Sequence, residues 1–255
     1  MPLSFPPREH VPLRNSPLRE VICQVRFPLI LRIANEAPIT FQEAIRDRFP
    51  NLETEHAMLV ELSIEKMRPA ALQPPTFRFT DKSKTRIVSL SLDFFSFSVN
   101  QYTGWDAFAS DLQYVADAAI SVYRIPYATR IGLRYINALT NDNTKSSQFF
   151  PDVVDIVQPE ITALLRNEAI QDPYIAISQL RVRHDDSHFS FRSGILEEED
   201  QPQSFLLDFD LYIEGEITID ASGLLELCDR YHALIYNAFR WAIKSEKLRI
   251  FEPVE

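Results

Sequence analysis

The sequence is short of glycine and cysteine, and each shortage argues against a class of function. Five glycines in 255 residues leave no glycine-rich phosphate loop, so a nucleotide cradle of that kind is not expected. The two cysteines, Cys23 and Cys228, lie far apart among apolar neighbours. This pattern predicts two buried thiols in a reducing compartment, without a disulfide framework or a metal site. The serine, cysteine and histidine residues form no recognisable nucleophile motif.

Long hydrophobic runs and an excess of positive charge are also missing. No stretch approaches the roughly 18 apolar residues of a membrane span, and the first residues do not read as a signal segment, so we expect a cytoplasmic protein with no membrane partner. A net charge of −10 argues against general nucleic-acid binding, because duplex affinity depends on Lys and Arg that neutralise phosphates. Of the 26 basic residues, 20 are Arg, a bias that suits carboxylate or phosphate contacts, or that reflects a GC-rich genome.

What the sequence does contain is the composition and hydrophobic spacing of a globular α+β protein. Hydrophobic residues make up 45% and aromatic residues 11%, enough for a substantial core. Alternating and helical spacings predict the elements along the chain. The predicted strands are 19–27, 56–67, 76–80, 85–92, 94–99, 128–136, 174–183, 187–194, 204–213 and a short 248–251; the predicted helices are 39–49, 104–123, 153–167, broken at Pro159, and 222–244.

The order of these elements repeats, which predicts an internal duplication. Each half runs from strands into a long helix, and Leu92-Asp93-Phe94 corresponds weakly to Leu207-Asp208-Phe209. We therefore predict an α+β fold of two similar lobes, each an antiparallel sheet packed on a long helix, with a saddle-like or helix-grip-like shape. The predicted organisation is an extended Pro-rich arm over 1–17, an N-terminal α+β lobe over 18–145 and a C-terminal α+β lobe over 146–255.

Four segments carry a resemblance to a known family: 15–27, 77–85, 102–108 and 129–137. The most distinctive is Arg-Ile-Gly-Leu-Arg-Tyr-Ile-Asn, from Arg130 to Asn137. Together they resemble a sporadically distributed bacterial family of uncharacterised proteins of similar length, over nearly the whole chain. The resemblance brings no activity, cofactor or catalytic residue. A patchy distribution resembles that of accessory genes in defence or toxin–antitoxin modules, and it implies a partner-binding role.

Four arginines are predicted to gather on one face of a sheet. Arg26, Arg78, Arg130 and Arg134 take the strand parity opposite to the core residues, so they form a candidate site for an acidic partner, a nucleotide or a phosphorylated ligand. Gly132 leaves room for a close approach or marks a bulge. The alternative is that the arginines form salt bridges with acids of the same sheet, namely Glu20, Glu61, Glu65 and Asp93.

Two further groups are candidates for chemistry. Asp208 and Asp210 project from one strand face, as a divalent-metal site requires, although Arg181 and Arg183 are alternative partners. The segment from His184 to His188 carries two His and two Asp, which makes it a candidate metal site. The simpler interpretation is that it forms a hairpin turn between two strands. The metal candidates are thus Asp208, Asp210, His184 and His188.

These observations favour a non-enzymatic binding or regulatory protein that needs no cofactor and docks a protein partner on the arginine-bearing face or at the junction of the two lobes. The first alternative is a sensor of a nucleotide or other small ligand, with a cavity between sheet and helix. The second alternative is a metal-dependent hydrolase built on the metal candidates, for which Asp208→Asn leaves the fold unchanged. The sensor's cavity is predicted to be lined by Tyr102, Trp105, Phe94, Phe95 and Phe97.

Overall fold

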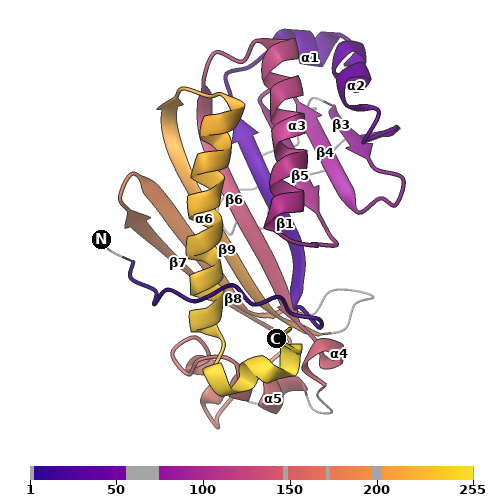
Figure 1. The fold of residues 1–255 in the computed structure, drawn as a ribbon. Coiled ribbons are helices and arrows are strands. Elements are labelled where there is room, and N and C mark those ends of the chain that lie inside the picture. The colour runs from indigo at the N-terminus through magenta and orange to yellow at the C-terminus, as the bar shows by residue number, and fades with distance from the viewer. Residues whose placement is uncertain (1–2, 56–74, 146–148, 171–172, 197–202, 255) are drawn as a thin grey trace.

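The computed structural model describes residues 3–55, 75–145, 149–170, 173–196 and 203–254 (Figure 1). In these ranges, nine strands form one antiparallel sheet in the order β2-β3-β4-β5-β1-β6-β9-β8-β7. The strands are β1 (Leu18–Arg26), β2 (Asn51–Glu55), β3 (Thr76–Thr80), β4 (Arg86–Ser91), β5 (Phe94–Val99), β6 (Ala128–Leu139), β7 (Ile175–His184), β8 (Ser187–Leu196) and β9 (Ser204–Ile217).

The prediction of two lobes, each with its own sheet, is wrong. β6 and β9 come from the two predicted lobes, yet they pair along their length, from Ala128 opposite Ile217 to Leu139 opposite Phe205. Because this ladder runs through the middle of the sheet, both parts of the chain share one sheet and one core. Whether the chain divides into two domains near residue 145 stays a prediction.

Two long helices, α3 (Trp105–Tyr123) and α6 (Ala221–Ala242), lie side by side on the same face of the sheet (Figure 1). The α6 helix begins at the N-cap Asp220, whose carboxylate accepts a hydrogen bond from the backbone N–H of Gly223. The α3 helix ends at Arg124, which takes a left-handed conformation. The remaining helices are α1 (Leu31–Asn35), α2 (Ile39–Ile45), α4 (Asn141–Thr144), α5 (Phe149–Ile156), η1 (Leu164–Arg166) and η2 (Ser245–Phe251).

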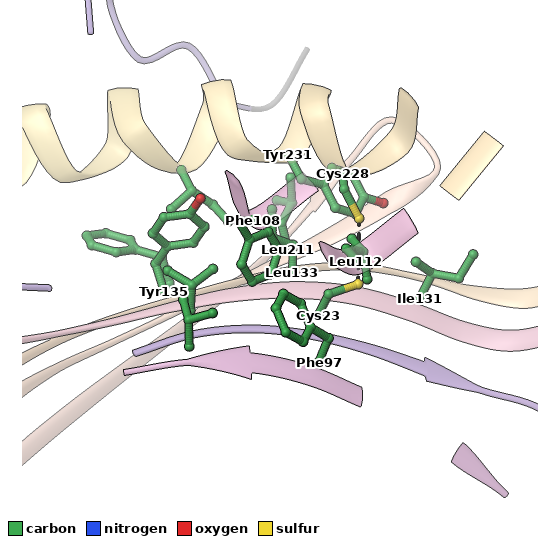
Figure 2. Packing of buried hydrophobic residues seen from close by; sticks show 14 of the residues in the cluster. Cys23, Phe97, Phe108, Leu112, Ile131, Leu133, Tyr135, Leu211, Cys228 and Tyr231 are labelled. Carbon is green, nitrogen blue, oxygen red and sulfur yellow. Dashed lines mark hydrogen bonds between the residues drawn. The ribbon is translucent and has the colours of Figure 1, made fainter. Parts of the chain in front are cut away.

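The core lies between these helices and the sheet. Alternate residues of the central strand β1 are fully buried there, among them Val21 and Cys23. Cys23 faces Cys228 of α6 (Figure 2), with the two sulfur atoms 3.7 Å apart and both thiols free. The predicted burial of both thiols is confirmed. Their contact was not predicted, because the residues are separated by 205 positions in the chain.

Several local predictions differ from the structure. The segment 248–251 is part of the 3-10 helix η2, not a strand. The helix predicted over 153–167 with a break at Pro159 is indeed in two pieces, but the first, α5, begins at Phe149 and the second is the short 3-10 helix η1. β2 was not predicted, and the strand predicted over 56–67 lies entirely outside the described residues. No helix within the described ranges combines the length and apolar character needed to cross a membrane.

Candidate functional site

The face of the sheet opposite α3 and α6 carries mostly polar side chains, and we call it the polar face. It follows from strand alternation: Val21, Cys23 and Val25 enter the core, so the residues between them project to the other side. Five neighbouring strands line a shallow cavity of about 560 Å³ on this face. Its walls are Ile22, Gln24 and Arg26 of β1, Arg130, Gly132 and Arg134 of β6, Asp208, Asp210, Tyr212 and Glu214 of β9, Ser190 and Arg192 of β8, and Gln179 and Arg181 of β7.

Asp208 is the centre of the polar face. Its side chain is only 3% exposed, and it lies between two arginines from the neighbouring strands. Arg134 donates from Nε to Oδ1 at 2.7 Å and from Nη2 to Oδ2 at 2.8 Å, a bidentate contact. Arg192 donates from Nε to Oδ2 at 2.8 Å. Two guanidinium groups on one carboxylate compensate its burial and leave the trio with a positive charge.

A second ion pair lies beside this trio. Arg130 Nη2 donates to Asp210 Oδ2 at 2.8 Å, and the guanidinium lies over the ring of Tyr212, 4.3 Å from its centroid. Burial raises the pKa of Asp210, although the charges of Arg130 and Arg134 oppose that rise. Gly132 admits this arrangement, because a Cβ there would lie 2.7 Å from Arg130 Nη1. The close approach predicted at Gly132 is thus made by an arginine of the same strand.

The structure brings three of the four predicted arginines together. Arg26, Arg130 and Arg134 all line the cavity, and Arg26 lies directly opposite Arg130 in the β1–β6 ladder. Arg78 projects to the same face from β3, but three strand spacings, about 14 Å, separate β3 from β1. Arg192 was missed, because nothing local in the sequence indicates that β8 pairs with β9.

The acids that neutralise these arginines also differ from the expected ones. Asp208 and Asp210 pair with Arg130, Arg134 and Arg192, and not with the arginines of β7. Of the acids proposed as alternatives, Glu20 contributes a charge near Arg134, whereas Glu61 and Glu65 lie outside the described residues.

The metal candidates do not converge. Asp208 and Asp210 share one face, as expected, but both carboxylates contact arginines. His184 is the last residue of β7 and His188 the second residue of β8, and the strand register directs them to opposite faces of the sheet. No group of three or more His, Cys, Asp or Glu residues suited to a metal ion occurs in the described ranges.

A second cavity, of about 200 Å³, lies on the helix side of the sheet, and we call it the aromatic pocket. Tyr102 lines it, and Trp105 lies behind it, where its ring stacks on His232 at 4.5 Å. Phe95 and Phe97, expected to line a cavity, are fully buried in the core instead, and Phe94 has the opposite parity. The walls are His10, Val11, Pro12, Leu13, Ser16, Leu18, Tyr102, Thr103, Gly104, Tyr135, Asn137, His232, Ile235, Tyr236 and Phe239.

Two polar groups of the aromatic pocket, His232 and Tyr102, are uncharged at neutral pH. His232 Nδ1 is 2.8 Å from the hydroxyl of Tyr135, and burial, together with the charge of nearby His10, lowers the pKa of His232 to about 4. Burial raises the pKa of Tyr102 to about 12. His10 and His232 come from opposite ends of the chain, and no local sequence signal could have joined them.

No family model and no curated protein matches this chain. The predicted resemblance to a bacterial family therefore stays a prediction.

Proposed function

We propose that this chain is a non-enzymatic binding or regulatory protein that docks an acidic protein partner on its polar face. The observation that supports this proposal is the charge of that face. Its cavity is lined by five arginines and three carboxylates, an excess of two positive charges on a chain of net charge −10. A local patch opposite in sign to the whole protein attracts and orients an acidic partner, while the rest of the surface repels it.

Within the polar face, the arginines divide into two groups. Arg130, Arg134 and Arg192 are engaged by Asp208 and Asp210 and give the centre a fixed geometry. Arg26 and Arg181, which we call the rim arginines, are exposed. No carboxylate of the described residues contacts either of them, and Arg26 donates only to Gln24 Oε1, at 3.4 Å. Their guanidinium groups are free to form bidentate contacts with carboxylates of a partner.

The spacing of the rim arginines favours a macromolecular partner. They stand on β1 and β7, four strand spacings or about 19 Å apart. A single small anion cannot contact both, whereas an acidic protein segment that crosses the strands can. A nucleotide or phosphorylated ligand, the alternative expected for these arginines, would bind the centre of the cavity and leave at least one rim arginine uninvolved. An accessory role in a cytoplasmic defence or toxin–antitoxin module stays a prediction.

Affinity purification from the native cells, at moderate salt and with quantitative mass spectrometry, tests the proposal. The baits are the wild type, the double variant Arg26→Glu/Arg181→Glu, and Arg46→Glu/Arg230→Glu as a control with the same change in net charge. Arg46, at the end of α2, and Arg230, on α6, are both exposed on the helix side. Arg130 and Arg134 are left intact, because changing them to Glu would leave the carboxylates of Asp208 and Asp210 without their ion-pair partners.

We expect an acidic protein to co-purify in stoichiometric amount with the wild type and with the control variant. It should be absent from the purification with the rim variant. High salt is expected to release the partner, because exposed charge pairs are screened. A wild type that elutes without any such protein, or a partner retained equally by all three baits, would show the proposal to be wrong.

A further inference from the structure

The aromatic pocket lies on the other side of the sheet, and the proposed docking surface does not involve it. Its floor is the end of β6 with Tyr135 and Asn137, and one wall is the face of α6 that carries His232, Ile235 and Tyr236. The loop that leads into α3 supplies Tyr102, Thr103 and Gly104. Three segments distant in the sequence therefore build one concave site.

The roof of the pocket is formed by the N-terminal segment, which crosses α6 (Figure 1). This segment is fastened on both sides of the cavity. Tyr236 Oη accepts from the backbone N–H of Val11 at 2.9 Å and donates to the carbonyl of Glu9 at 3.0 Å. Further along, Val254 N donates to Pro12 O at 2.9 Å. The roof is held by specific hydrogen bonds at both ends, so the cavity beneath it has a defined shape.

The rings that surround the cavity suit a flat ligand. The ring of His10, in the roof, lies 4.7 Å from that of Tyr236 and 5.9 Å from that of His232. Tyr135 and Tyr102 meet edge to face at 6.0 Å. Among the described residues, no Asp, Glu, Lys or Arg lines the pocket, so it favours an uncharged molecule. A cavity of about 150 Å³ is known to hold benzene, so 200 Å³ is sufficient for one ring or two fused rings.

One polar group in the pocket is left without a partner. The hydroxyl of Tyr102 is buried, and no described residue meets it with normal hydrogen-bond geometry, although the hydroxyl of Tyr135 lies close enough to influence its pKa. A buried hydroxyl without a partner is costly, and a ligand that hydrogen-bonds to it recovers that cost. The neighbouring hydroxyl of Tyr135 is already engaged with His232, so Tyr102 is the group available to a ligand.

We propose that the aromatic pocket binds a small, uncharged, planar heteroaromatic molecule, which packs among the rings of His10, His232 and Tyr236 and accepts a hydrogen bond from the hydroxyl of Tyr102. The N-terminal segment forms one side of the cavity, so the bound ligand contacts it directly.

Isoquinoline is a suitable probe, because it has two fused rings and one ring nitrogen that accepts a hydrogen bond. Naphthalene has the same shape without the acceptor. Both are titrated into the full chain at neutral pH, and binding is followed by heteronuclear NMR. The variants are Tyr102→Phe, which removes the unpartnered hydroxyl, His10→Ala, which removes a roof ring, and the control Tyr174→Phe, at a tyrosine 70% exposed outside the pocket.

We expect isoquinoline to shift the resonances of Tyr102, His232 and the backbone of residues 9–13. Tyr102→Phe should weaken isoquinoline binding about fivefold, because the loss of one hydrogen bond changes the binding constant by about that factor. It should leave naphthalene binding unchanged. His10→Ala should weaken both ligands, and Tyr174→Phe neither. Tyr102→Phe should fold as the wild type does, because its hydroxyl makes no hydrogen bond of normal geometry with the described residues.

Three results would overturn the inference. The first is that isoquinoline does not bind up to its solubility limit. The second is that naphthalene binds the wild type as tightly as isoquinoline does. The third is that neither Tyr102→Phe nor His10→Ala changes the affinity for isoquinoline.

Discussion

Replacing Asp208 with Asn tests the central arrangement of the polar face. The carboxylate is buried, and it accepts hydrogen bonds from both Arg134 and Arg192. An Asn side chain keeps the shape but loses the charge, and its NH₂ group turns a donor toward guanidinium donors. Asp208→Asn should therefore leave two arginines without their shared partner.

The magnitude follows from the burial of each group. Breaking a buried ion pair costs about 3–5 kcal/mol. The side chains of Arg134 and Arg192 are 34% and 37% exposed, so water recovers part of that cost. We expect Asp208→Asn to lower the free energy of unfolding by about 2–3 kcal/mol, which for a chain of this size lowers the Tm by about 5–10 °C.

Asp210→Asn is the matched control, two residues away on the same strand. Asp210 pairs with one arginine, and burial raises its pKa, so its charged form is already disfavoured in the folded protein. Its replacement should cost about 1 kcal/mol or less. Urea denaturation of both variants at neutral pH measures the difference. Equal losses of stability in the two variants would refute this reasoning. So would a loss below about 0.5 kcal/mol for Asp208→Asn, which is the result expected if Asp208 served a metal-dependent hydrolase and not the fold.

Two titrating groups give further predictions. The pKa of His232 lies near 4, below its ordinary value of 6.5, so the unfolded chain binds this proton at a higher pH than the folded chain does. The free energy of unfolding should therefore fall by about 3 kcal/mol as the pH drops from 6.5 to 4, and His232→Gln should abolish this slope in urea denaturation. For Asp81, burial disfavours the ionised form, but hydrogen bonds within its turn outweigh burial and lower its pKa to about 2. The ionised Asp81 carboxylate therefore stabilises the fold fully above about pH 4, and this stabilisation of about 2 kcal/mol should be lost as the pH falls toward 2. Calorimetry should detect the loss in the wild type and not in Asp81→Asn.

The polar face was largely predictable because strand parity is a local property. The alternation of Val21, Cys23 and Val25 is enough to assign Arg26 to the opposite face, and the same argument applies to Arg130. Parity does not specify which strands are neighbours. Arg78 obeys the same rule and still lies three strands away from Arg26, because the sheet order places β4 and β5 between them.

The fold and the aromatic pocket depend on contacts that are remote in sequence. The two-lobe prediction failed at the pairing of β6 with β9, because each strand pattern alone is equally compatible with a sheet edge and a sheet centre. The pocket requires His10 to meet His232, at opposite ends of the chain. Sequence spacing could indicate Tyr102 as an aromatic candidate, but not the segment that covers it.

The most direct measurement on the docking proposal is arginine footprinting with phenylglyoxal, on the isolated protein and on the complex recovered from the native cells. The account predicts that Arg26 and Arg181 react readily in the isolated protein, since both are exposed, and are protected in the complex. Arg230, exposed on the helix side, should react equally in both. Protection of Arg230 with unchanged reactivity of Arg26 and Arg181 would contradict the account, because the partner would then cover the helices and not the polar face.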